Sequence, residues 1–433
     1  MEQLVFPMTA AAACDVDGVG PKAGNLAALG RAGLPIPDGF CLSAAAYRRQ
    51  LAALEADLGL DLSARRGTND AEVMAARKQA IAIRLALLSR PIVPEILDPL
   101  LSSWQALTAR SNGAPTVVRS SSLVEDRFGS SFAGQFESYL GLDNEADFLT
   151  AVRACWAALW SPRILRTMMN HQASPADTAM GVLVQPLVAA RASGGGLSRT
   201  ADGEMLLSAT WGLGSAIAQG EVVPDRYVLS ADGELQNSEA GRKSHSVGCQ
   251  HHGAGGTQVL SGDVVWERCL ADSQAVELGG YLRRAEQLMG MPVEIEWTMD
   301  DGGFKLLQSR PLHLEPAHVP DEIWLSHPKL SGQPAGVGWG TGRACVVNCE
   351  CELSRVGPGD ILVTKVAGPA LSRILTRVAG VVAELGGSTS HLASLARERG
   401  IPMVLGVRNA TQRIPDGKHT AVDGVAGIVR WMA

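Results

Sequence analysis

The fold of the C-terminal region is decided by Gly386-Gly-Ser-Thr-Ser-His-Leu-Ala-Ser-Leu-Ala-Arg-Glu-Arg-Gly400. A glycine-rich turn follows the apolar strand expected at Gly380–Ala383 and enters a helix, for which Thr389 or Ser390 is the natural N-cap. Gly400 ends that helix, because glycine is the preferred residue just beyond a helix C-terminus. The stretch therefore predicts a strand, a turn and a short helix in succession.

His391 lies in the first turn of this expected helix, whose buried stripe is Leu392, Leu395 and Ala396. Unpaired backbone N–H groups and the positive end of the helix dipole meet at that turn. They disfavour an imidazolium, so the ring stays a neutral nucleophile near pH 7. They also favour a phosphoryl group on the ring. Judged from its position alone, His391 is equally well interpreted as a structural residue that caps the helix or forms a hydrogen bond.

The rest of the chain has the composition of a multidomain globular protein. It has 433 residues, 46% hydrophobic and 19% charged, and a formal net charge of −6. This length predicts two or three domains. Lys and Arg are scattered, so we expect no nucleic-acid partner. We find no span-length apolar run and no signal peptide, so we expect no membrane partner and a cytoplasmic location.

The eight cysteines suggest reduced thiols rather than a disulfide framework. Cys345, Cys349 and Cys351 lie close together, but no second cluster completes a zinc site of usual spacing. The segment His245–His252 is richer in possible ligands. Its two adjacent histidines would point to opposite faces of a strand, so structural zinc is disfavoured there too.

Residues 1–310 alternate helix and strand signals. Helices are expected at Pro21–Gly33, Ala71–Ser89 and Ser273–Met289. The run Ser193-Gly-Gly-Gly196 is expected to form a turn or flexible loop. Strands are expected at Thr116–Val118, Gly181–Val188, Glu204–Ala209, Arg226–Leu229 and Val293–Thr298.

A proline-rich linker is expected at residues 312–323. Residues 324–433 then form a compact α/β unit. Its strands are expected at Ala344–Asn348, Asp360–Thr364, Gly380–Ala383 and Met403–Leu405.

The C-terminal unit resembles the phosphohistidine domain of phosphoenolpyruvate synthase, pyruvate phosphate dikinase and rifampin phosphotransferase. The likeness rests on Gly386–Ala393 and Ala396–Gly406, and it extends from about Gly332 to Gly424. The resemblance implies that His391 is the catalytic histidine and that this unit is a swivelling domain.

A first candidate phosphate site is Gly18-Val-Gly-Pro-Lys22, a tight turn that feeds a helix with Pro21 at its first position. Lys22 would then lie beside exposed N–H groups, which suits a phosphate tail. The Walker A spacing is missing. Alone the signal is weak, because lysines in first helical turns are usually only solvated.

Other segments point to the same chemistry. Val117–Asp126 places Arg119 at a strand end beside hydroxyl and carboxylate groups. The small-residue loop Ser130–Glu137, with Gly134 and Gln135, would let the backbone approach phosphates closely. Gln185 would edge an adenine pocket.

Two further segments, Val293–Trp297 and Leu307–Pro311, are expected to be adjacent strands. Glu294 and Glu296 would share one face of their strand, and Gln308 and Arg310 one face of theirs. Two carboxylates and a carboxamide suit Mg2+, and an arginine would clamp phosphoryl groups. A surface lattice of salt bridges is the alternative.

Together these segments resemble the ATP-grasp domain of the same dikinase family, over residues 15–311. The matching motifs occur in the family's order. They are Val-Gly-x-Lys22, Val-Arg119-Ser-Ser, Ser-Phe-Ala-Gly-Gln135, Trp-Gly-Leu-Gly214, Val-Pro-Asp225 and Gln308-Ser-Arg310-Pro.

The resemblance implies residue roles. Lys22, Arg119 and Arg310 would bind phosphates, and both arginines would act in catalysis. Gly134, Gln135 and Gln185 would contact the nucleotide. Glu296 and Gln308 would bind the metal ion, and Glu294 would lie in the coordination shell around that ion. One departure is Ser215, which stands where the family usually has Glu.

The expected fold is therefore α/β (α+β), an ATP-grasp domain followed by a β/β/α swivelling phosphohistidine domain. The ATP-grasp domain would span residues 1–311, with subdomains at about 1–190 and 191–311. We expect no room for an acceptor domain in this chain.

The expected activity is a dikinase reaction that cleaves ATP to AMP through phosphorylated His391, with Mg2+ as cofactor and a small-molecule acceptor. A split dikinase with a separate acceptor subunit is the alternative. A non-catalytic nucleotide sensor is disfavoured, because the chemical residues are all present. An acid–amine ligase is disfavoured too, because it has no use for His391.

Overall fold

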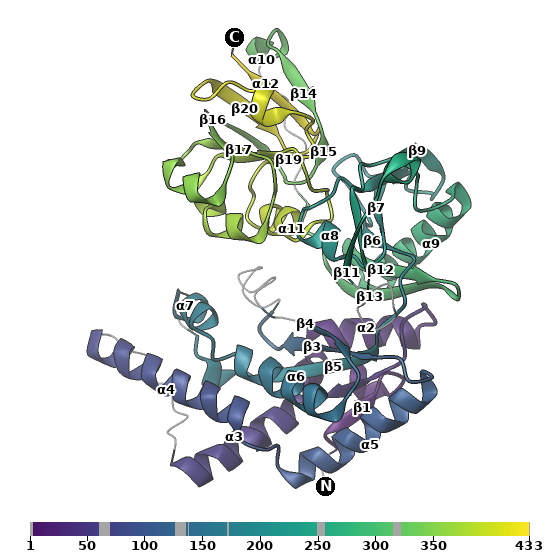
Figure 1. Ribbon diagram of the computed structural model, residues 1–433, viewed down its shortest axis with the longest axis vertical. Coiled ribbons are helices and arrows are strands. Elements are labelled where there is room, and N and C mark those ends of the chain that lie inside the picture. Colours follow the sequence, from purple (N-terminus) through teal and green to yellow (C-terminus); the bar gives the residue numbers. More distant parts are fainter. Residues whose placement is uncertain are drawn as a thin grey trace. The chain divides into compact units, whose positions relative to one another are not determined.

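The structure is a computed structural model that describes residues 3–59, 70–125, 136, 138–170, 173–248, 256–314 and 322–432 (Figure 1). It divides into two compact units. Unit 1 comprises Met1–Val188 and Lys305–Arg310, and unit 2 comprises Ala189–Phe304 and Pro311–Ala433. Within the described ranges, none of the helices is long and apolar enough to cross a membrane.

Unit 1 is built on a five-stranded antiparallel sheet with the order β1-β2-β5-β3-β4. Its central pair, β3 and β5, aligns Arg119 with Leu183. β3 continues four residues beyond the predicted strand end at Val118. The strands are β1 Val5–Pro7, β2 Phe40–Leu42, β3 Thr116–Ser122, β4 Ser138–Leu142 and β5 Met180–Pro186.

Helices pack on this sheet and on one another; α6, for example, contacts both β3 and α4. Aromatic side chains fill the core between them, and Trp160 donates a hydrogen bond from Nε1 to the Tyr47 hydroxyl at 2.8 Å. Both predicted helices of this unit are present, as α2 and α4. The main helices are α2 Pro21–Arg31, α3 Ala44–Leu58, α4 Asp70–Ser89, α5 Pro94–Arg110, α6 Glu145–Ala158 and α7 Pro162–Asn170.

The first part of unit 2 is an antiparallel sheet whose strands wholly within the unit are ordered β12-β6-β7-β8-β9. Helix α9, Asp272–Met289, packs on this sheet. A separate hairpin pairs β10, His245–Gly248, with β11, Gly256–Val259. The sheet strands are β6 Ala192–Leu197, β7 Met205–Trp211, β8 Asp225–Leu229, β9 Leu235–Glu239 and β12 Val293–Asp300.

The prediction of a loop at Ser193–Gly196 is wrong, because this run lies in strand β6 between β7 and β12. Its glycines make room for close neighbours. A Cβ on Gly194 would lie 1.8 Å from the Ser208 carbonyl oxygen, and one on Gly195 would lie 2.6 Å from Cβ of Thr389. Glycine in a strand interior often marks such a close approach.

The C-terminal part of unit 2 has an eight-stranded sheet with the order β14-β21-β20-β16-β17-β18-β19-β15. The neighbours β16 to β19 are parallel, and the remaining pairs are antiparallel. All four predicted strands are present, although β16 begins earlier than expected. The strands are β14 Lys329–Ser331, β15 Gln333–Pro334, β16 Trp339–Val347, β17 Ile361–Thr364, β18 Gly380–Ala383, β19 Met403–Leu405, β20 His419–Asp423 and β21 Ile428–Trp431.

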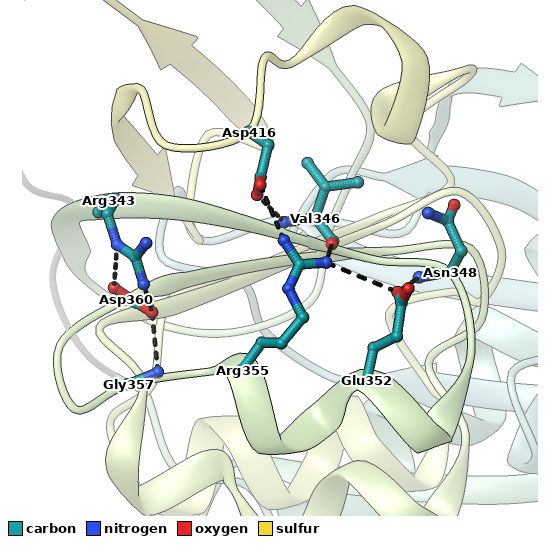
Figure 2. Close-up of polar contacts among 8 residues, drawn as sticks. All are labelled: Arg343, Val346, Asn348, Glu352, Arg355, Gly357, Asp360 and Asp416. Carbon is teal, nitrogen blue, oxygen red and sulfur yellow. Dashed lines mark hydrogen bonds and ion pairs between the residues drawn. The ribbon is translucent and has the colours of Figure 1, made fainter.

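Two ion pairs tie the connection between β16 and β17 to the sheet (Figure 2). Arg343 donates to both carboxylate oxygens of Asp360, at 3.1 and 2.7 Å. Burial alone would raise the pKa of the Asp360 carboxyl. Hydrogen bonds from Arg343 and the Gly357 amide, together with the Arg343 charge, outweigh burial and hold that pKa below its ordinary value. The second pair joins Arg355 to Asp416 at 2.9 Å.

The expectation that the thiols are reduced is wrong at one place, where Cys349 and Cys351 form a disulfide. Their Cα atoms are 5.3 Å apart, within the range that a disulfide bridges. Cys249 lies outside the described residues. The free cysteines in the described ranges are Cys14, Cys41, Cys155, Cys269 and Cys345.

Candidate active site

Lys22 lies in the first turn of α2, as the sequence predicts, but its amine is buried and has partners. Nζ donates to the Ser120 carbonyl oxygen at 3.0 Å and forms a 3.1 Å ion pair with Glu125. The second Glu125 oxygen is buried and has no hydrogen-bond partner among the described residues. If the Lys22 amine leaves Glu125, it is able to bind phosphate. A cation that arrives with the phosphate is then able to take the place of the amine at the Glu125 carboxylate.

The N-terminus of α2 is held tightly against β3. The Ala23 amide donates to the Ser121 hydroxyl at 3.1 Å. Gly20 caps the helix with φ of +85°, and a Cβ there would lie 2.2 Å from the Ser121 carbonyl oxygen. Only glycine fits this position without strain. The predicted turn and helix are thus anchored on the strand that carries Arg119.

Arg119 projects from β3 toward β13, Gly303–Pro311, a strand divided between the units. Its guanidinium donates to the Leu307 carbonyl oxygen at 2.5 Å and to Oε1 of Gln308 at 3.0 Å. Arg310, two residues farther along β13, is half-buried. Unit 1 therefore brings together three predicted site residues, Arg119, Gln308 and Arg310.

Gln185 is 3% exposed on β5, and its amide donates to the Pro37 carbonyl oxygen at 3.1 Å. This buried amide therefore fixes the backbone at Pro37 to β5. Two other predicted nucleotide contacts, Gly134 and Gln135, lie outside the described residues.

In unit 2, His391 opens helix α11, His391–Glu398. The N-cap is Ser390, whose hydroxyl accepts a hydrogen bond from the Ala393 amide at 3.2 Å. The predicted stripe of Leu392, Leu395 and Ala396 is buried, while His391 is half-buried. The imidazole thus lies at the helix N-terminus, where an anion on the ring is favoured.

Helix α11 contacts the first part of unit 2 through Glu294 of β12. Arg397 Nη2 donates to Glu294 Oε1 at 3.0 Å, and the Ser394 hydroxyl donates to Oε2 at 3.0 Å. The Arg397 and Glu294 side chains are 4% and 6% exposed. The other Arg397 terminal nitrogen binds the carbonyl oxygens of Ser388 and Ala335. Arg397 therefore links the turn before His391 to β12.

The turn itself packs closely on the same part of unit 2. The Gly386 amide donates to the Val222 carbonyl oxygen at 3.0 Å. A Cβ on Gly387 would lie 2.3 Å from Cγ of Pro224. α11 also lies beside the short helix α8, Ser215–Ala218 (Figure 1). We call this contact, formed by residues 386–397 with β6, β12 and residues 220–224, the docking face.

The two glutamates on β12 have different surroundings. Both oxygens of Glu294 are used at the docking face, whereas Glu296 is exposed. Among the described residues, no group of three or more His, Cys, Asp or Glu could hold a metal. A magnesium ion held mainly by nucleotide phosphates needs only one or two protein carboxylates. In unit 2 the exposed Glu296 keeps its place as a candidate ligand, whereas both oxygens of Glu294 already accept hydrogen bonds.

Sequence reasoning missed Arg397 and Ser394 as docking residues. Both follow His391 at helical spacing, which was a usable signal, but their partner lies about 100 residues earlier in the chain. Ser215, the departure from the family pattern, opens α8 with its hydroxyl buried.

The fold defines a class of α/β proteins in which an ATP-grasp domain is followed by a swivelling phosphohistidine domain. Residues 16–323 match the family model "Pyruvate phosphate dikinase, AMP/ATP-binding domain". Residues 356–427 match "PEP-utilising enzyme, mobile domain". The chain belongs to this family of pyruvate phosphate dikinases and PEP-utilising enzymes.

Curated relatives agree with this assignment. Phosphoenolpyruvate synthase of Pyrococcus furiosus is 29% identical over 96% of this chain and 57% of its own length. A probable phosphoenolpyruvate synthase of Methanothermobacter thermautotrophicus is 30% identical over 96% of this chain and 61% of its own. The uncharacterized phosphotransferase YvkC of Bacillus subtilis is 33% identical to this chain. That match covers 68% of this chain and 33% of the length of YvkC. The chain thus spans little more than half the length of the synthases.

Proposed function

We propose that this chain cleaves ATP to AMP through phosphorylated His391 and passes a phosphoryl group to a small-molecule acceptor. The observation that carries the proposal is the position of His391, half-buried in the first turn of α11 behind the Ser390 cap. A neutral imidazole there is a nucleophile, and the helix N-terminus stabilises the phosphoryl group that it gains. The cationic side chains of unit 1 support the nucleotide part of the proposal.

In the first step, an imidazole nitrogen of His391 attacks the β-phosphorus of ATP. The bond between that phosphorus and the oxygen bridging to the α-phosphate breaks, and AMP leaves. The histidine then carries a diphosphoryl group, whose terminal phosphoryl group passes to water or inorganic phosphate. The remaining phosphoryl group passes to the acceptor. Positioning and charge neutralisation supply most of the rate in such transfers.

Lys22, Arg119 and Arg310 bind the ATP phosphates in this scheme. Lys22 and Arg119 now contact protein groups, so nucleotide binding exchanges those partners for phosphate oxygens. Arg119 would leave Gln308, which frees the carboxamide oxygen.

The family resemblance implies Mg2+ as cofactor, with Glu296 and the Gln308 carboxamide as its proposed ligands. A bound Mg2+ would neutralise phosphate charge. Glu294 stays with Arg397 and Ser394 while α11 is docked, so its predicted place in the metal shell requires α11 to leave.

The test is product analysis with purified protein and Mg-ATP. The proposal predicts AMP rather than ADP, and it predicts loss of AMP formation in the His391→Ala variant. The control variant is His419→Gln, which changes an exposed histidine on β20. AMP formed at the same rate by the His391→Ala and wild-type proteins would contradict the proposal.

The same preparation decides between the small-molecule acceptor and a separate acceptor subunit. A phosphohistidine that decays when small carboxylic acids such as pyruvate are added supports the first. A phosphohistidine that resists them and decays only when other protein fractions are added would support the second.

A further inference from the structure

The disulfide between Cys349 and Cys351 lies on the surface of the C-terminal domain, where β16 is followed by the short helix η5, Glu350–Arg355. Both cysteines are exposed. The other cysteines in the described ranges are free. The bond is therefore not part of a disulfide framework of the kind that stabilises small secreted domains.

Its short spacing gives this disulfide little structural value. A disulfide stabilises a fold mainly by restricting the unfolded chain, and the effect grows with the length of the loop that is closed. Cys349 and Cys351 are only two positions apart, so the loop is very short and the effect is small.

Other contacts hold the surrounding segment in place (Figure 2). Arg355 donates to the Val346 carbonyl oxygen at 3.1 Å and pairs with Asp416 at 2.9 Å. The Asn348 amide donates to Oε2 of Glu352 at 2.8 Å. None of these contacts involves a sulfur atom, so we expect the segment to keep its hydrogen bonds when the disulfide is reduced.

A cavity of about 280 Å3 adjoins the disulfide. Among the described residues, Cys349 lines this cavity and Cys351 does not. The cavity also lies against Val347 and Thr364, which end the parallel strands β16 and β17. Ligands of open α/β sheets commonly bind at the carboxyl ends of such strands. A water molecule takes about 30 Å3, so the cavity has room for a small organic molecule.

We propose that Cys349 and Cys351 form a reversible redox site that exchanges with small monothiols entering this cavity, and that Cys349 is the cysteine attacked. Exposed disulfides are typically the labile ones, because exchange requires a thiolate to reach a sulfur atom. A monothiol held in the cavity lies beside Cys349. The site is independent of the nucleotide chemistry proposed above, because it contains none of the residues assigned to phosphoryl transfer.

The exchange takes place in two steps. The thiolate of a monothiol attacks Sγ of Cys349, a mixed disulfide forms, and the bond to Cys351 breaks. Cys351 leaves as a thiolate and takes a proton from the solvent. A second monothiol thiolate then attacks the first monothiol's sulfur and releases Cys349 as a thiolate. Two monothiols are thereby oxidised to one disulfide, and the protein disulfide is reduced to two thiols.

The first test follows the cysteine pair in the folded full-length protein, with no nucleotide present. The protein is equilibrated in mixtures of 2-mercaptoethanol and its disulfide, quenched with acid, unfolded, alkylated and mapped by mass spectrometry. We expect the peptide with Cys349 and Cys351 to change reversibly between disulfide and dithiol while the circular dichroism spectrum stays native. Reduction that occurs only together with unfolding would overturn the proposal, as would a pair that is never oxidised.

The second test asks which cysteine is attacked. Cys351→Ser leaves the exposed Cys349 thiol, and Cys349→Ser leaves the exposed Cys351 thiol. With the disulfide of 2-mercaptoethanol as reagent, we expect the mixed disulfide to form roughly tenfold faster at Cys349, the effect of about 1.4 kcal/mol of binding in the cavity. Burial raises the pKa of Cys345, which should stay unmodified in both variants. Equal rates at Cys349 and Cys351 would overturn the assignment of the attacked cysteine.

A variant that fills the cavity separates binding from the intrinsic reactivity of the thiol. Gly368 lines the cavity with φ of −77°, and a Cβ there would lie 3.9 Å from the nearest atom, on Val366. Gly368→Leu in the Cys351→Ser chain should remove the rate advantage of Cys349. Gly280→Leu on α9 is the matched control and should keep it, because a Cβ there meets nothing within 4 Å. An unchanged rate in the Gly368→Leu chain would show that the cavity does not hold the reagent. Either outcome leaves AMP formation through His391 to its own test.

Discussion

Nη2 of Arg397 lies 3.0 Å from Oε1 of Glu294, and the two side chains form a buried ion pair between α11 and β12. The helix that begins with His391 is therefore attached to the strand that carries Glu294 and Glu296. A carboxylate used in this way holds helix α11 in place on β12. This ion pair must break whenever α11 leaves β12.

Removal of one partner of this pair should destabilise the docked arrangement strongly. Arg397→Met removes the guanidinium that balances the buried Glu294 carboxylate, and breaking a buried ion pair in this way costs about 3–5 kcal/mol. Hydrogen exchange should become faster in the α11 amides of this variant. Glu294→Gln in the same chain should recover part of the loss, because it removes the buried negative charge that Arg397 balances in the wild-type protein. Unchanged exchange in Arg397→Met would show that the ion pair does not hold α11.

Gly195→Ala should separate the docking face by steric means. The new Cβ would lie 2.6 Å from Cβ of Thr389, a distance that requires one side to move. Overpacking of this kind costs about 1–3 kcal/mol, and thermal unfolding and α11 exchange should both report it. The control is Gly280→Ala in α9, where a Cβ meets nothing within 4 Å. Gly280→Ala should be neutral or stabilising by up to about 1 kcal/mol.

Lys22 and Glu125 offer a direct test of whether the lysine binds phosphate. Lys22→Met should weaken ATP binding roughly ten- to hundredfold, the effect of losing a charge-assisted hydrogen bond of about 1.5–3 kcal/mol. Glu125→Gln should keep or improve ATP binding, because it releases the amine from its ion pair. Isothermal titration with ATP measures both. Equal losses in the two variants would mean that the pair has only a structural role.

Much of the C-terminal architecture follows from local sequence. The Ser390 cap, the His391 helix and the strands β18 and β19 were all predictable, because caps, glycine stops and apolar periodicity act over a few residues. In β6 the rule that glycine runs form turns failed, because Gly195 makes room for Thr389, which lies far along the chain. Glycine is selected both in turns and where two parts of the chain pack closely, and local sequence does not distinguish the two.

The site was predictable as a set of residues but not as a set of contacts. Arg119 and Gln308 are 189 positions apart, and their hydrogen bond depends on how β3 and β13 meet. Glu294 and Glu296 lie two residues apart on β12, so the alternation of side chains along a strand places both on the same face. Their burial differs because Arg397 and Ser394 cover one and leave the other exposed.

Cys41 should resist alkylation in the folded protein. Burial, aided by the nearby Cys14, raises the pKa of Cys41 to about 12. At pH 8 about one thiol in ten thousand would be ionised, and only the thiolate reacts. Iodoacetamide at pH 8 followed by peptide mapping should label Cys14, which is partly exposed, well before Cys41. Equal labelling of the two cysteines would contradict the packing of β2.

Arg343→Gln should make the C-terminal domain less stable at neutral pH, because the low pKa of Asp360 depends on Arg343 (Figure 2). A carboxyl whose pKa is lowered by folding adds stability above its unfolded pKa, near 3.8, and loses it as pH falls toward the folded pKa. The difference in Tm between wild type and variant should therefore shrink below about pH 4. The exposed Arg373→Gln is the control; a difference that stays constant with pH would contradict the assignment.

The most direct test of the central claim follows the phosphate of ATP onto His391. Protein is incubated with Mg-ATP labelled at the β- or γ-phosphate and analysed at mildly alkaline pH, where phosphohistidine survives. We predict that β-label stays on the peptide containing His391, that AMP accumulates, and that the His391→Ala protein acquires no label. A labelled peptide obtained only from γ-labelled ATP, with ADP as product, would contradict the dikinase account.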